Sequence, residues 1–310
     1  MKHIRLLVIL GIVCAVLATP YIVYIARSPV LIVTDAPFAA LYGVKHLRQQ
    51  RNSASFTLFR QVKPVRVADG VSPDVVIYAI TEASSRPFCV LFARNQAMGA
   101  LRFHEQFPEI PVVVLRGLVE TPELPPPDGF LCIYAVDREV DLYRAGLFAG
   151  ILGKMKQEPA LQAENQGASA AKSYILWQER SADTAGRELF TRGVRENDPE
   201  THIVFVNSIA GAPDPKVVSC AVLTGAGAEY LEKNPRIPVV LFSWLDPLLT
   251  ALEVAVQFDD SAWALAVPAA RMAALRQAEG KIPSKPLIFP RKIADNNIFR
   301  MLKESAKKMP

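Results

Sequence analysis

The chain has 310 residues, of which about 280 follow a first apolar segment, and this length suits two lobes of roughly 100–200 residues each. Its formal charge of +5 is uneven, because residues 271–310 hold ten Lys or Arg and three Asp or Glu. No aromatic residue stands between Lys303, Lys307 and Lys308, which argues against a nucleic-acid partner. The basic tail is interpreted as a solvated helical end, and the alternative is a patch that faces anionic lipid or an acidic partner.

The first element is an uncharged apolar segment, Leu6 to Ala26, which follows the basic residues Lys2, His3 and Arg5. This charge pattern keeps an N-terminus in the cytoplasm while the segment enters the bilayer, so we expect an extracytoplasmic, periplasmic protein. Its 21 residues are enough for an uncleaved anchor in the inner (cytoplasmic) membrane, which we favour. The alternative is secretion after cleavage of a signal peptide, for which residues 16–18 form an acceptable site.

Short β-branched runs then alternate with longer amphipathic stretches, which predicts parallel sheets covered by helices. In the first half we expect a helix at Phe38–Gln50, and strands at Val30–Thr34, Phe56–Val62, Val75–Ile80, Cys89–Phe92, Val112–Leu115 and Phe130–Val136. Several of these runs are apolar at consecutive positions, as strands buried on both faces must be.

A long helical pattern at Asp137–Gln157 opens a second α/β series, after which Pro159–Ala171 is expected to be a loop. The series continues with predicted helices at Ala182–Arg195 and Ala226–Lys233, and strands at Tyr174–Trp177, Ile203–Val206, Val217–Leu223 and Val239–Phe242. The end of the chain is less regular, with a strand at Glu253–Phe258, a helix at Ser261–Gln277, an edge strand at Leu287–Phe289 and a helix at Asn297–Lys307.

These elements predict an α/β protein of two lobes, in which parallel sheets are flanked by helices and an N-terminal transmembrane or signal helix precedes them. We expect the signal or anchor helix at residues 1–28. The first lobe then takes residues 29–136 and 245–258, and the second takes residues 137–244 and 259–310. A late return of the chain across both lobes explains this division.

Ligands of open parallel sheets bind beyond the carboxyl ends of the strands, and acidic residues follow four predicted strands there. These residues are Asp35, Asp137, Asp246 and Asp259. With the nearby aromatic residues Phe38, Trp244 and Phe258 they could surround one interlobe cleft and hold a flat ligand that carries hydroxyl or amine groups. The alternatives are structural, since Asp after a strand caps helices and aromatic residues at strand ends belong to cores.

The chain shows no carrier of catalysis, so we expect no enzyme, no cofactor and no metal. Its four histidines lack ligand spacing, and no nucleophile or zinc-protease motif occurs. The turn Thr224–Gly227 has two glycines of a phosphate-binding loop but neither the third glycine nor a Walker lysine. Cys89, Cys132 and Cys220 each lie in an apolar run and are expected to be buried, not bridged.

Three segments resemble a known family. Asp137–Gly150 joins an acidic residue to Ala-Gly-Leu-Phe-Ala-Gly, and Phe190–Glu200 joins a phenylalanine and a glycine to an Asp-Pro turn. The third segment combines a strand and glycine loop, Val222–Gly227, with a strand that leads to an Asp, Val239–Asp246. In order and spacing, from Val30 to the C-terminus, they resemble the basic membrane protein family of solute-binding proteins, within the type I periplasmic-binding fold. The resemblance implies a nucleoside-like solute and an ABC transporter permease as partner.

Two departures from the family pattern bear on function. Thr34–Ala39 stands where the family has Asp-x-Gly-Gly, so only Asp35 and Phe38 carry over. The family's lipoprotein cysteine is replaced by the apolar anchor. The leading hypothesis is a membrane-anchored, extracytoplasmic solute-binding protein of an ABC-type transport system, which closes on a small polar solute by hinge motion. The alternative is a relative without ligand that acts as a sensor or an envelope interaction module.

Overall fold

The computed structural model describes residues 18–35, 44–68, 70–93, 96–116, 124–164, 174–178, 184–206, 218–223, 237–242, 254–289, 293 and 296–308. The chain divides into two compact units. Unit 1 contains Met1–Ala135 and Ala262–Ile282, and unit 2 contains Val136–Ser261 and Pro283–Pro310. The chain therefore passes from one unit to the other three times.

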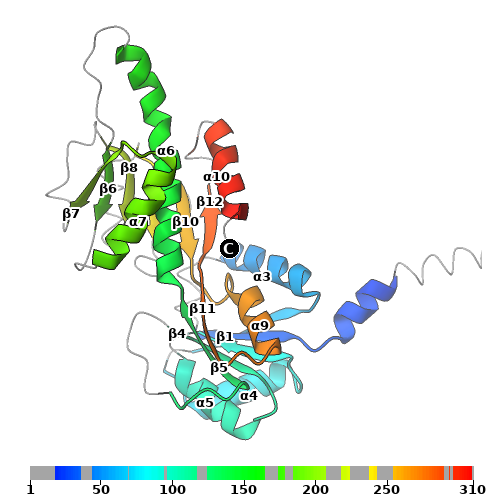
Figure 1. The fold of residues 1–310 in the computed structure, drawn as a ribbon. Coiled ribbons are helices and arrows are strands. Elements are labelled where there is room, and N and C mark those ends of the chain that lie inside the picture. The colour runs from blue at the N-terminus through cyan, green and yellow to red at the C-terminus, as the bar shows by residue number, and fades with distance from the viewer. Residues whose placement is uncertain are drawn as a thin grey trace, which may run out of the picture. The chain divides into compact units, whose positions relative to one another are not determined.

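Unit 1 is built on a six-stranded sheet in the order β11-β5-β4-β3-β1-β2. Its strands are β1 (Val30–Asp35), β2 (Val62–Val67), β3 (Cys89–Phe92), β4 (Val112–Arg116), β5 (Leu131–Val136) and β11 (Glu279–Ile282). The first five pair in parallel along the order β5-β4-β3-β1-β2. The helices α4 (Pro73–Ala83) and α5 (Ala97–Gln106) cover one face, and α3 (Val44–Leu58) and α9 (Ala266–Ala274) cover the other (Figure 1).

Two of the strand predictions for this unit are wrong. The run Val75–Ile80 lies in helix α4, where Val76, Ile77 and Ile80 are buried while Val75 and Tyr78 are exposed. Burial at i, i+1 and i+4 is the helical period, and Pro73 suits the first turn of a helix. Phe56 lies in α3, and the strand that follows begins only at Val62. That strand contains Pro64, which β2 accommodates because it is an edge strand.

Unit 2 repeats this arrangement in the order β12-β10-β9-β8-β6-β7. Its strands are β6 (Tyr174–Gln178), β7 (His202–Val206), β8 (Val218–Leu223), β9 (Val239–Phe242), β10 (Val256–Asp259) and β12 (Lys285–Ile288). All its pairs are parallel except β10 with β12 at the edge. Its helices are α6 (Arg138–Glu164), α7 (Thr184–Asn197) and α10 (Asn296–Lys308). The predicted α/β fold, with parallel sheets flanked by helices, is confirmed in both units (Figure 1).

The helices α6 and α7 pack with their backbones in contact, because glycines face each other across the interface. A Cβ added to Gly146 would lie 2.2 Å from the Phe190 carbonyl oxygen. A Cβ added to Gly193 would lie 2.1 Å from the Tyr143 carbonyl oxygen. At Gly150 the nearest atom, the Val194 oxygen, would be 2.8 Å away. The small residues of the predicted Ala-Gly helix therefore allow this close approach.

The division of the C-terminal part differs from the prediction. The prediction gives residues 245–258 to the first lobe, but β10 belongs to the sheet of unit 2. It gives residues 262–282 to the second lobe, but α9 and β11 belong to unit 1. The predicted helix Ser261–Gln277 is shorter in the structure, where α9 spans Ala266–Ala274. Helix α6 continues into the predicted loop, as far as Glu164. The predicted helix Ala226–Lys233 lies outside the described residues.

Near the N-terminus, residues 18–26 form a helix, and the earlier part of the expected apolar segment lies outside the described residues. No helix in the described part of the chain combines the length and apolar character that crossing a membrane requires.

Candidate functional site

The strand orders locate a crevice at the carboxyl edge of each sheet. After β1 the chain adds β2 on one side and β3 on the other, and after β6 it adds β7 and then β8 in the same way. Strands that leave in opposite directions open a crevice where open α/β sheets bind ligands. Each unit therefore has its own candidate ligand crevice, at the ends of β1 and β3 in unit 1 and of β6 and β8 in unit 2.

In unit 1, the predicted residue Asp35 is the last residue of β1, in register with Val67 of β2. Its backbone thus reaches the carboxyl edge, as expected, while its side chain and Phe38 lie outside the described residues. The neighbouring strand end contributes Gln96, which precedes α5 with 9% of its surface exposed. Its backbone N–H donates to the Ala93 carbonyl at 2.8 Å. Sequence analysis missed Gln96, although an amide side chain just after a buried strand was the signal.

In unit 2, Asp137 caps helix α6. Its Oδ1 accepts a hydrogen bond from the Val140 N–H at 3.2 Å, and its carbonyl accepts one from the Asp141 N–H at 3.1 Å. This geometry matches the capping alternative. A carboxylate has room for several donors, so Asp137, which is half-buried, also stays a candidate for ligand contact.

Asp259 ends β10 and is fully buried. Its Oδ1 accepts a hydrogen bond from the Ser261 N–H at 2.9 Å, and it is the register partner of Lys285 in β12. Burial lowers the pKa of Lys285, while the Asp259 carboxylate acts in the opposite direction. Asp259 is therefore engaged inside unit 2, and its predicted role in ligand binding gains no support from this position.

Phe258 is a correction to the predicted site. Its ring is fully buried in the core of unit 2, where its centroid lies 5.8 Å from that of Phe148 and 5.2 Å from that of Phe242. The core alternative holds because strand β10 is covered on both faces. Trp244 and Asp246 follow β9 but lie outside the described residues, so their role stays a prediction.

A buried polar cluster that sequence analysis did not find lies at the same edge of unit 2. The Ser284 N–H donates to both oxygens of Asp141, at 2.9 and 3.2 Å, and Arg144 donates to the Ser284 carbonyl at 3.4 Å. Burial raises the pKa of Asp141 to about 7, against the effect of Ser284 and Arg144. Burial likewise lowers the pKa of Arg144. These contacts fasten the start of β12 to the first turns of α6.

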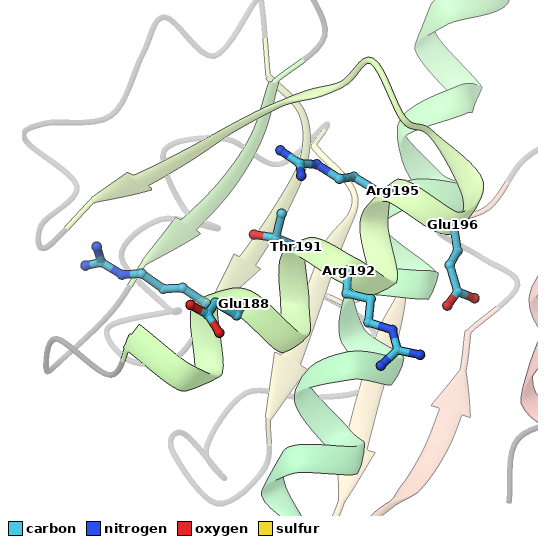
Figure 2. Close-up of a pocket in the computed structure, with 6 residues that line it drawn as sticks. Glu188, Thr191, Arg192, Arg195 and Glu196 are labelled. Carbon is cyan, nitrogen blue, oxygen red and sulfur yellow. The ribbon is translucent and has the colours of Figure 1, made fainter.

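A surface hollow of about 600 Å³ lies along α7 (Figure 2). Six side chains of that helix line it: Arg187, Glu188, Thr191, Arg192, Arg195 and Glu196. Two of these charged side chains interact with Tyr143 of α6. Arg192 lies over the Tyr143 ring, and the Tyr143 hydroxyl donates a hydrogen bond to Glu196 at 2.6 Å. Figure 2 shows Arg195 pointing away from Arg192 and Glu196, so these groups do not converge on one ligand. The hollow is therefore described as a surface of helix α7 and not as a ligand site.

The described residues offer no group of three or more His, Cys, Asp or Glu that could hold a metal ion. Cys89, Cys132 and Cys220 are buried, as the apolar runs predicted. Burial raises the pKa of the Cys89 thiol, so this group is not an activated nucleophile.

No protein-family model matches this chain, and no curated protein matches it either. Solved structures do. An ABC transporter solute-binding protein from Conexibacter woesei has a TM-score of 0.52 and 10% identity, over 91% of this chain and 96% of that one. A transcriptional activator of the comK gene from Bacillus halodurans has a TM-score of 0.50 and 12% identity, over the same shares.

The chain has a periplasmic-binding-protein-like fold. The agreement extends across both units and nearly the whole length of each of these structures. At 10–12% identity the likeness shows the fold alone, and the basic membrane protein family stays a prediction from the sequence.

Proposed function

We propose that this chain is an extracytoplasmic solute-binding protein of an ABC-type transport system, tethered to the inner membrane by its first apolar segment. The observation that carries the proposal is the repeated strand order, which gives each unit a ligand crevice at its carboxyl edge. An ABC transporter solute-binding protein has the same fold over 96% of its length, which supports this role.

The ligand that suits the candidate residues is small and polar. Asp35, Asp137 and Asp246 accept hydrogen bonds from hydroxyl or amine groups, and Gln96 both donates and accepts. Phe38 and Trp244 are the proposed stacking partners for a flat ring. A nucleoside-like solute meets both requirements, and a sugar meets the first.

A second candidate function is that of a sensor or envelope interaction module that has lost its ligand. Its specific support is the segment Thr34–Ala39, which lacks the glycines of the family's first loop. A protein described as a transcriptional activator shares the fold, so the fold serves more than transport.

A thermal-shift screen separates the two. The full chain in detergent would be heated with nucleosides, sugars and amino acids, each in large excess. A ligand at a hundredfold excess over its dissociation constant stabilises the folded state by roughly 2.7 kcal/mol, which raises the melting temperature of a chain of this size by about 4 °C. A hit supports the binding role, and the absence of any shift across the panel would favour the sensor.

The proposed site is tested on the hit compound with Asp246→Ala, which should abolish the shift. Asp74→Ala is the matched control, because Asp74 is a carboxylate on α4 with 77% of its side chain exposed and is not one of the proposed ligand-binding residues. A variant at Asp246 that still responds like the control would show that the site is placed wrongly.

A further inference from the structure

The stretch between Asp35 and Asp69 carries positive charge without compensation. It contains Lys45, Arg48, Arg51, Arg60, Lys63 and Arg66, and not one Asp or Glu. The structure places the described part of this stretch in α3, in the short turn after α3 and in the edge strand β2 of unit 1. A one-signed patch of this kind attracts an anionic partner.

Exposed apolar side chains lie beside this charge. Among the described residues ten large hydrophobic side chains are exposed, and six of them belong to the helix of residues 18–26 or to the end of α3. They are Tyr21, Ile22, Val23, Ile25, Phe56 and Phe59. Phe56 is 84% exposed, which is unfavourable in water and marks a contact surface.

Direct contacts join the two elements into one face. The Tyr24 and Phe59 ring centroids are 5.9 Å apart, and the Arg27 guanidinium lies 5.2 Å from the Phe59 ring centroid. Arg60 donates to the Ser28 carbonyl at 3.1 Å. Burial and the neighbouring Arg27 lower the pKa of Arg60, so an anion beside this pair of guanidinium groups would be stabilising.

A hollow of about 490 Å³ opens in this face, and Tyr24, Arg51, Phe56, Phe59 and Lys63 are among the residues that line it. We call these five residues, with Arg27, the aromatic-basic face. None of the residues that line the hollow is acidic.

The chemistry of the face matches the surface of an anionic bilayer. Aromatic rings concentrate at the headgroup level, and each Lys or Arg near an anionic membrane contributes about 1 kcal/mol of attraction. The face also continues the apolar segment that we propose as the membrane tether, since Tyr24 and Arg27 stand at its end. A soluble acidic partner would meet the charge but would leave exposed residues 21–25 uncovered.

We propose that unit 1 rests on the membrane through the aromatic-basic face, with anionic lipid headgroups between its basic side chains and Phe56 in the interface. This inference rests on the membrane tether of the proposed function. The face would then hold unit 1 at the membrane surface in addition to the tether.

The test uses the full chain reconstituted in vesicles of phosphatidylcholine with or without phosphatidylglycerol. A fluorophore is attached at Phe56→Cys in a Cys14→Ser background, and its quenching by spin-labelled lipid is measured. The cysteines at 89, 132 and 220 are buried and do not compete for the label. Tyr78→Cys is the matched control, because Tyr78 is an aromatic residue of the same unit, on α4, with 68% exposure.

In vesicles that contain phosphatidylglycerol, the label at position 56 should be quenched several-fold more than the label at 78. The difference should shrink when Arg51→Glu and Lys63→Glu are combined, and also in high salt, where the Debye length falls from about 10 Å at 0.1 M to about 3 Å at 1 M.

Failures of the tether and of the face give different results. A chain that is not retained by either kind of vesicle would contradict the tether itself. A retained chain with equal quenching at 56 and 78 would overturn the inference while the tether stands. Strong quenching at 56 that is the same without phosphatidylglycerol would overturn the role of anionic lipid.

Discussion

Asp141 is a carboxyl group of unit 2 in a setting that disfavours a charge. It is fully buried, and burial outweighs the hydrogen bonds from Ser284 and the positive charge of Arg144, with Asp137 adding a small unfavourable charge. Its pKa is raised from 3.8 to about 7. The folded protein therefore holds a proton here, between about pH 4 and pH 7, that the unfolded chain has lost. This contribution to stability is complete below pH 4 and is lost as the pH rises through 7.

We predict that Asp141→Asn flattens the pH dependence of stability. Each unit of pKa difference corresponds to about 1.4 kcal/mol, so the wild type should lose a few kcal/mol of unfolding free energy between pH 5 and 8. Asparagine stays neutral and still accepts from the Ser284 N–H. Urea unfolding at both pH values measures the effect, and the exposed Asp74→Asn should keep the wild-type dependence. Equal slopes for Asp141→Asn and the wild type would contradict the assigned pKa.

Asp137 and Asp141 show what can be predicted at single residues. The cap at Asp137 is local, because its partner Val140 is three residues away, and sequence analysis weighed it correctly as an alternative. The environment of Asp141 depends on Ser284, 143 residues further along the chain. Local sequence patterns do not relate residues that are so far apart in the chain, so the buried cluster could not be predicted from the sequence.

At the scale of elements, the contact of α6 with α7 is the most demanding, because backbone atoms and not side chains meet there. A Cβ at Gly193 would lie 2.1 Å from the Tyr143 oxygen and 2.9 Å from the Leu147 nitrogen. Backbone cannot rotate away as a side chain can, so the two helices would have to separate.

We predict that Gly193→Ala destabilises unit 2 by about 3 kcal/mol, at the upper end of the usual cost of overpacking, even though alanine favours helices by about 1 kcal/mol. Gly99→Ala in α5 is the control, since the three atoms nearest to its added Cβ all belong to the Val76 side chain, the closest at 3.1 Å. That variant should change stability by less than about 1 kcal/mol. Denaturant unfolding of both variants would refute the prediction if Gly193→Ala proved as stable as Gly99→Ala.

The type of an element, helix or strand, was predictable where its apolar pattern fits only one of the two. The strands β1, β3, β4 and β9 are apolar at consecutive positions and were placed within a residue or two. The run Val75–Ile80 has the same composition, but its burial follows a helical period that apolar residues on the exposed side conceal. Composition alone could not show which of those residues would face water.

At the scale of the whole molecule, the path of the chain decides which residues share a core. Residues 262–282 return to unit 1, where β11 joins β5, and the chain then adds β12 and α10 to unit 2. The segment Glu279–Ile282 is short and mostly polar, so its sequence does not indicate which of the two sheets it joins. The two lobes were predictable from the repeated alternation of strands and helices. The unit to which each element near the C-terminus belongs was not predictable.

Each unit has a core of its own, which predicts that a core mutation acts on one unit. Leu302 of α10 is fully buried in a cluster made only of unit 2 residues, and Phe103 of α5 is 1% exposed in a cluster made only of unit 1 residues. Leu302→Ala should cost about 2–5 kcal/mol and Phe103→Ala about 3–5 kcal/mol. Hydrogen exchange reports where the loss falls, because amide protection follows local opening.

Leu302→Ala should accelerate exchange in β8, β9 and β10 while β1, β3 and β4 keep their protection, and Phe103→Ala should give the reverse pattern. The two variants thus serve as controls for each other. If either one raised exchange equally in both sheets, the units would unfold as one cooperative body. The three passages of the chain would then couple the two cores despite their separate packing.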